Sequence, residues 1–204
     1  MLTLENLEIL IAVGIFCYAV YRTGIEFGLS QYNPFIKLKP LSEKEQEVLS
    51  KTFVMYGRLP DALRKKCNER IVWFRSKKSF VFYGQVDKTE ELRLVLSATA
   101  AFMLLGFRNY KMHRSLFRVI VYPSQYYSKI NRRYHLGEYN PKFKTLVLSA
   151  DKIYEGFEIP DDNKNLAVHE FAHALSFEML KKGSWEARRF RVGTRKIRTL
   201  FEKQ

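Results

Sequence analysis

Signals for the start of a helix stand in front of apolar residues at helical spacing in the region that follows position 40. Ser42 and Glu45 match a capping box, in which a serine and a glutamate three positions on satisfy each other's backbone N–H groups. A helix is therefore predicted from there to about Tyr56. Pro60 and Asp61 predict the start of a second helix, because proline fits the first turn of a helix.

Further along, a long apolar run predicts a buried helix and two short runs predict strands. Asp87 and Glu90 form another capping-box pattern, and the run that they introduce is apolar over most of its surface and ends at Gly106. Runs of β-branched and aromatic residues at 117–122 and 145–149 predict strands. The polar stretch between these two runs predicts a loop.

The next apolar segment predicts a helix that begins at Asn165 and continues to about Leu180. The residues just before it, 161–164, predict a polar turn. No internal repeat is present in the sequence. The chain is therefore expected to form one folded region of several helices and at least two strands.

The N-terminus contains an uncharged run of thirteen residues, from Ile9 to Tyr21. A membrane-spanning helix needs about 20 apolar residues, and the run approaches that length only if Arg22 and Glu26 are tolerated. Three interpretations are open: a single membrane-anchor helix, a buried core helix and a cleaved signal peptide. We favour the anchor, because acidic rather than basic residues precede the run. Basic residues follow it, which predicts that the remainder of the chain lies in the cytoplasm.

These patterns predict three parts of the chain. Residues 1–30 form an N-terminal hydrophobic helix that acts as a membrane anchor. Residues 31–40 form a linker, because two prolines lie within Asn33–Pro40. Residues 41–204 form the folded domain.

Composition excludes several classes of protein. Hydrophobic residues make up 47% of the 204 residues and aromatic residues 15%, which excludes a disordered chain. Two cysteines are too few for a disulfide scaffold or a thiolate zinc site. The net charge is +14, and residues 181–204 contribute +7 of it. We interpret this basic end as a solvated helix face, and nucleic acid is not an expected partner because no motif for it lies nearby.

The sharpest motif in the sequence is HEFAH at positions 169–173. Two histidines four positions apart lie on the same face of a helix, so His169 and His173 can bind one metal ion. Zinc is the expected ion, because it suits imidazole and is the metal of HExxH proteins. Glu170 projects at a different angle and can reach the activated water without binding the metal, which predicts a general base.

A catalytic zinc ion needs a third protein ligand. The metzincin class is excluded, because it requires glycine and histidine where this chain has Ser176 and Met179. The remaining common choice is a glutamate that follows the motif, and upstream histidines are fallback ligands. The candidates are Glu178, Glu186 and Glu202, with His113 and His135 as the fallback.

Several segments together resemble one known family. They are VHEFAHAL at 168–175, VIVYPSQYY at 119–127, GEYN at 137–140, LVLSAD at 146–151 and SATAAFMLLGFRNY at 97–110. The combination resembles the MtfA-type zinc-dependent peptidases, gluzincin-like proteins named for a factor that binds the glucose repressor Mlc. The resemblance covers roughly Leu41 to the end of the chain.

The resemblance implies that His169 and His173 bind zinc and that Glu170 is catalytic. It also implies a third ligand from a glutamate in an acidic, aromatic helix well beyond the motif. This chain ends 31 residues after His173 without such a segment. We therefore expect the C-terminal part of the domain 41–204 to be incomplete.

The resemblance further implies an α+β fold, in which a zincin-like metallopeptidase domain follows the N-terminal hydrophobic helix. In such domains a strand beside the active helix commonly binds the substrate backbone by strand addition. Leu146, Val147, Leu148 and Ser149 are predicted to form this strand.

The expected function is therefore a zinc metallopeptidase that hydrolyses peptide bonds of a peptide or protein substrate, with a zinc-activated water and Glu170 as general base. The alternative is a regulatory binding protein that sequesters a transcriptional repressor and has a degraded or dispensable active site. The expected location is a bacterial inner membrane, crossed once with the catalytic domain in the cytoplasm. Without the span, the expected location is the cytoplasm.

Overall fold

The computed structural model describes residues 4–26, 38–108, 111–128, 132–158, 165–180 and 183–201. The chain divides into two compact units, Met1–Lys37 and Leu38–Gln204. The described part of the first unit is one helix, α1 (Leu4–Glu26). All other elements belong to the second unit.

The expected membrane span is wrong. Among the described residues, none of the helices combines the length and the apolar character that a bilayer crossing requires. Helix α1 carries charged residues near both ends, and only thirteen uncharged residues separate Glu8 from Arg22. At about 1.5 Å per residue such a stretch covers about 20 Å, against a hydrocarbon core of about 30 Å. The single-pass arrangement expected from the sequence is therefore contradicted. Of the predicted hydrophobic anchor, the described residues form only an N-terminal helix, α1.

The second unit is an α+β fold. Its helices are α2 (Glu43–Thr52), α3 (Val54–Gly57), α4 (Asp61–Lys77), α5 (Thr89–Met103), α6 (Ala150–Glu158), α7 (Leu166–Leu180) and α8 (Trp185–Phe201). Its strands are β1 (Ser79–Phe82), β2 (Arg118–Tyr122), β3 (Tyr126–Ser128), β4 (Arg133–His135), β5 (Gly137–Asn140) and β6 (Thr145–Ser149).

Four strands form one sheet in the order β1, β2, β6, β5. The first three are parallel, and β5 runs antiparallel to β6 at the edge. The two central strands, β2 and β6, are rich in β-branched and aliphatic residues, which suits strands with a neighbour on each side. Strands β3 and β4 form a separate antiparallel pair that leads from the end of β2 to the start of β5.

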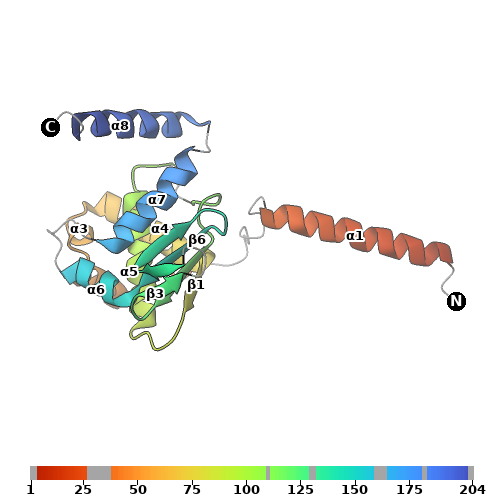
Figure 1. Ribbon diagram of the computed structural model, residues 1–204, viewed down its shortest axis with the longest axis horizontal. Coiled ribbons are helices and arrows are strands. Elements are labelled where there is room, and N and C mark those ends of the chain that lie inside the picture. The colour runs from red at the N-terminus through yellow and green to blue at the C-terminus, as the bar shows by residue number, and fades with distance from the viewer. Residues whose placement is uncertain are drawn as a thin grey trace. The chain divides into compact units, whose positions relative to one another are not determined.

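One face of this sheet packs against helices α5 and α7 (Figure 1). Val119, Val121, Leu146 and Leu148 point to this face and are 0% exposed. Helix α7 contributes Phe171 and two alanines, Ala167 and Ala174, to the same core. The HEFAH segment therefore lies on a helix that the core holds against the sheet.

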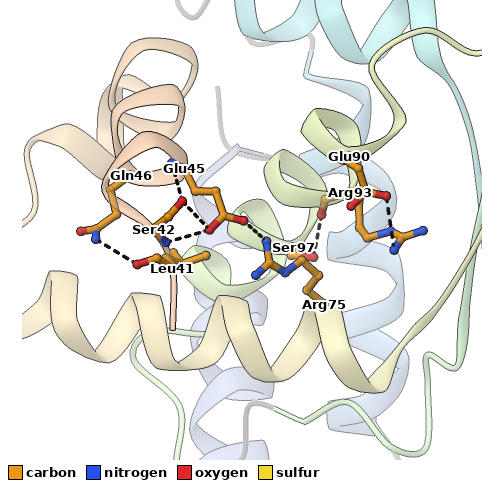
Figure 2. A network of polar contacts seen from close by, with 8 residues as sticks. All are labelled: Leu41, Ser42, Glu45, Gln46, Arg75, Glu90, Arg93 and Ser97. Carbon is orange, nitrogen blue, oxygen red and sulfur yellow. Dashed lines mark hydrogen bonds and ion pairs between the residues drawn. The ribbon is translucent and has the colours of Figure 1, made fainter. Parts of the chain in front are cut away.

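The first capping box forms as predicted and connects α2 to α4 (Figure 2). The Ser42 hydroxyl accepts from the N–H of Glu45 at 3.3 Å, and the Ser42 N–H donates to the Glu45 carboxylate at 2.8 Å. The other oxygen of Glu45 pairs with Arg75 of α4. The helix ends at Thr52 rather than near Tyr56, because Phe53 leaves helical geometry at φ −118° and ψ 85° before the short α3 begins.

The second capping box is wrong. Helix α5 forms, but its N-cap is Lys88 in a left-handed conformation with φ 48°, and the cap makes no side-chain hydrogen bond. The prediction of a loop between the two strand runs is also incomplete, because β3, β4 and β5 all lie in that segment. The predicted turn at 161–164 lies outside the described residues.

Candidate metal centre

Helix α7 presents the two histidines of the motif on one exposed face. Asn165 starts the helix as expected, with its side-chain oxygen accepting the N–H of Val168 at 3.0 Å. Four positions apart on the helix, His169 and His173 have perpendicular rings with centroids 4.7 Å apart. Their Nε2 atoms are 3.1 Å apart. Both imidazoles are open to solvent, so they carry little of the desolvation that an apolar helix would otherwise impose.

The separation of the two Nε2 atoms fits a shared zinc ion. Zinc lies about 2.0–2.1 Å from each imidazole nitrogen, so two ligands at a tetrahedral angle are about 3.3–3.4 Å apart. The 3.1 Å that separates Nε2 of His169 from Nε2 of His173 is close to this value. Neutral imidazole is also a donor that zinc prefers. The residues present therefore fit two of the protein ligands of a zinc site.

Glu170 differs from its two neighbours because its side chain is buried. It is 7% exposed and lies on the side of α7 that faces β5. Burial is the main influence on its carboxyl group and raises its pKa, while the nearby His169 and His173 and a hydrogen bond from the backbone of Tyr139 act in the opposite direction. The result is a pKa above the usual range for a glutamate. A carboxylate with raised basicity beside the two imidazoles of His169 and His173 suits proton transfer.

Gly137 allows β5 to lie close to α7 at this point. A Cβ atom added to Gly137 would be 2.8 Å from Cδ1 of Leu166 and 3.1 Å from Cγ of Glu170. Both distances are shorter than an ordinary carbon–carbon contact. The glycine of the GEYN segment therefore favours the close approach of the strand to Glu170.

A cleft of about 560 Å³ lies between β4, β5 and α7. Both Glu170 and His173 line it, so the predicted base and one predicted ligand share an open cavity. Its other lining residues are Arg133, His135, Gly137, Glu138, Tyr139, Pro141, Ser176, Phe177 and Leu180. The motif is therefore reached from solvent between the edge of the sheet and the helix.

The structure separates the predicted third ligands. Glu178 is 1% exposed and accepts the N–H of Arg114 at 3.0 Å, while Glu186 on α8 accepts the N–H of Arg108 at 2.7 Å. The ring of His113 lies against Trp73, with centroids 5.5 Å apart.

Of the predicted third ligands, His135 shares the cleft with Glu170 and His173, and Glu202 lies outside the described residues. Within the described parts of the chain, no three His, Cys, Asp or Glu side chains are grouped closely enough to hold a metal ion.

The substrate strand predicted from the sequence is in the wrong place in the sheet. Strand β6, with Leu146, Val147, Leu148 and Ser149, has β2 on one side and β5 on the other. Its backbone groups are used on both sides, so it has no open edge for a substrate. Of the strands in the main sheet, the edge strand β5 is the one that borders the cleft.

The HEFAH motif does not identify three residues at this site: Arg133 and Glu138, which line the cleft, and Tyr126, which lies beside Glu138. The hydroxyl of Tyr126 donates to the carboxylate of Glu138 at 3.4 Å, and Nε of Arg133 donates to Nε2 of His135 at 3.1 Å. Tyr126 and Glu138 lie in the YPSQYY and GEYN segments, which the family resemblance had already singled out. That shared position in the resemblance is the signal that could have identified them.

Comparison with known proteins finds one relative and one matching family model. An uncharacterized protein of Synechocystis sp., slr2042, is 27% identical over 148 residues, which cover 67% of this chain and 54% of that protein. The chain thus spans about half the length of the curated relative that it matches. The family model for the glucose-regulated metallo-peptidase M90 matches residues 30–182, which include β5, the cleft and the whole HEFAH segment. The chain therefore belongs to the M90 family of glucose-regulated metallopeptidases, as its resemblance to the MtfA-type peptidases had indicated.

Proposed function

We propose that this chain is a zinc-dependent peptidase that hydrolyses peptide bonds at the cleft between α7 and β5. The observation that carries the proposal is the pair of imidazole nitrogens 3.1 Å apart, beside a buried glutamate, in a member of a metallopeptidase family. His169 and His173 would hold the ion. When bound, zinc would supply Lewis-acid activation of water and of the scissile carbonyl.

Glu170 acts as the general base in this proposal. Its carboxylate takes a proton from the attacking water as the oxygen adds to the peptide carbonyl carbon. The same carboxyl group then gives the proton to the leaving amine as the C–N bond breaks. The burial of Glu170 favours this exchange, because burial raises the pKa of its carboxyl group toward neutrality. The N–H of Tyr139 keeps the carboxylate oriented toward the cleft.

Strand β5 binds the substrate backbone in this proposal. The N–H of Ser149 donates to the carbonyl of Leu136 at 2.9 Å, so this pair is hydrogen-bonded and the next pair, Gly137 with Leu148, is not. The backbone groups of Gly137 and Tyr139 therefore point away from β6. An extended peptide can pair with this edge through the N–H and carbonyl of Gly137 and the carbonyl of Tyr139, because the Tyr139 N–H already donates to Glu170. This pairing places the peptide backbone beside Glu170.

Replacement of Glu170 with glutamine tests the assigned base. Glu170→Gln keeps the size of the side chain but removes the proton acceptor. We expect peptide hydrolysis to fall by about 10²- to 10⁴-fold while bound zinc is unchanged. New peptide termini would be followed by mass spectrometry on a mixture of extended peptides, and zinc by elemental analysis.

Glu155→Gln on α6 is the matched control, because this glutamate pairs with Lys152 at the surface, away from the motif in the chain. It should leave hydrolysis unchanged. Hydrolysis that persists in the Glu170→Gln variant would remove Glu170 from the mechanism. Failure of the wild-type chain to retain zinc would contradict the proposed function itself.

A further inference from the structure

Four aromatic side chains form a continuous stack at one end of the sheet, which we call the aromatic row. They are Tyr83 after β1, Tyr122 at the end of β2, Tyr126 in β3 and His135 in β4. The centroids of successive rings are 5.2, 5.0 and 6.2 Å apart, and successive ring planes differ by 15°, 15° and 27°. These values correspond to offset stacking along the whole row.

Strand register creates the aromatic row. The N–H of Tyr83 donates to the carbonyl of Val121 at 2.9 Å, which extends the pairing of β1 with β2 and places Tyr83 beside Tyr122. In the second sheet, Tyr126 and His135 are directly opposite each other, so their side chains share one face of the hairpin. The row is therefore a fixed surface that crosses from the main sheet to the hairpin.

The aromatic row joins the cleft at its hairpin end. His135 lines the cleft, and Tyr126 hydrogen-bonds to Glu138, which also lines it. At the far end Tyr83 is 48% exposed, and the other three rings are half-buried. Among the described residues, no member of the row belongs to the two hydrophobic cores. The row is thus an accessible aromatic surface that continues one wall of the cleft.

A peptide paired with β5 would reach the aromatic row beyond Gly137, since β4 and β5 are separated by a single residue. We propose that the row is a subsite that binds an aromatic side chain of the peptide substrate, several residues from the bond that is cut. This inference rests on the proposed function, because it identifies the substrate class of the same site. The exposed edges of stacked rings favour an aromatic side chain, which gains edge-to-face contacts with them.

Peptide binding tests the subsite without requiring cleavage. The full chain with Glu170→Gln is loaded with zinc and titrated with labelled extended peptides of alanine and serine, in which one phenylalanine is moved along the sequence. We expect one phenylalanine position to bind about threefold to tenfold more tightly than the all-alanine peptide. Fluorescence anisotropy measures each affinity.

Substitutions of two neighbouring rings of the stack, Tyr83 and Tyr122, assign the preference to the row. Tyr83→Ala and Tyr122→Leu should reduce the preference for phenylalanine toward onefold, and Tyr83→Phe should keep it. Tyr134→Ala is the matched control, because Tyr134 is 67% exposed and lies on the other face of the hairpin. Since Tyr83 is also exposed, the Tyr83→Ala chain should fold, and its thermal midpoint would verify this.

The outcomes separate the subsite from the proposed function. Equal affinity for all peptides, or a preference that survives both Tyr83→Ala and Tyr122→Leu, overturns the subsite. A row-dependent preference together with no hydrolysis by the chain that retains Glu170 supports the subsite and contradicts the peptidase. Hydrolysis with no preference for any phenylalanine position supports the peptidase and overturns the subsite.

Discussion

At the level of single residues, a buried lysine holds the segment that precedes β2. The Nζ of Lys78 donates to the carbonyls of Lys111, Met112 and Leu116 at 2.7, 3.2 and 2.7 Å. Burial lowers the pKa of Lys78 to about 7, although the charge of Glu178 opposes this shift. Since Glu178 lies on α7, this lysine and that glutamate hold the segment between the sheet and the helix of the motif.

Loss of this lysine should destabilise the fold. In Lys78→Met three carbonyls lose their donor inside the protein, and we expect the free energy of unfolding to fall by about 2–4 kcal/mol. Urea denaturation at neutral pH measures the change. Lys66→Met on the exposed side of α4 is the control and should change the free energy of unfolding by less than about 0.5 kcal/mol.

The wild type and Lys78→Met should differ in how their free energies of unfolding depend on pH. An unfolded lysine keeps its proton up to about pH 10.4, whereas folded Lys78 releases it above about pH 7. The unfolded state therefore binds more protons between these values, and the free energy of unfolding of the wild type rises with pH relative to Lys78→Met. The gain disappears as the pH falls through 7. Equal pH dependence of the two proteins would show that Lys78 does not titrate in this range.

The residues of the motif were the part of the site that sequence could predict. A spacing of four on a helix is sufficient to bring the rings of His169 and His173 together, and this is a local property. Glu138 reaches the cleft, and Tyr126 reaches Glu138, only through the pairing of short strands far from the motif in the chain. No local pattern specifies that pairing, so these residues could not be derived from spacing alone.

At the level of elements, the contact between β5 and α7 determines the shape of the site. Gly137→Ala adds a methyl group 2.8 Å from Leu166 and 3.1 Å from Glu170. We expect the strand or the glutamate to shift, with a loss of about 1–3 kcal/mol in the free energy of unfolding and a fall in hydrolysis. Urea denaturation and peptide cleavage would measure the two effects.

Gly106→Ala is the matched control for this substitution. A Cβ atom added at Gly106 has no neighbour within 4 Å, so the substitution should leave both stability and hydrolysis unchanged. If Gly137→Ala behaved in the same way, close packing of β5 against Glu170 would not matter for the site.

Long elements were predictable and short ones were not. The helices at 61–77 and 166–180 and the central strands were found because burial imposes a regular apolar pattern on them. Strands β1 and β5 have only four residues each, and every residue in them is half-buried, so they carry no alternation of apolar and polar positions. The second capping box failed because Asp87 is one position too early, and the backbone of Lys88 forms the N-cap instead.

At the level of the whole molecule, both hydrophobic cores lie in the second unit. Their buried members extend from Leu41 to Ala187, and none of them comes from the described part of α1. We therefore expect a chain of residues 38–204 to fold with the same thermal midpoint as the full protein and to bind the same amount of zinc. Differential scanning calorimetry and elemental analysis would measure both. A markedly lower midpoint would show that the first unit supports the second.

The edge position of β5 determines which part of the sheet opens first, and therefore how the proposed hydrolysis is lost. β5 is bonded to one strand, whereas β6 is bonded to two, so small fluctuations should release β5 while the centre of the sheet stays intact. Native-state hydrogen exchange should therefore show faster exchange for the amides of Glu138 and Asn140 than for those of Leu146 and Leu148. Mild denaturant would then abolish turnover well before the cooperative melting of the domain.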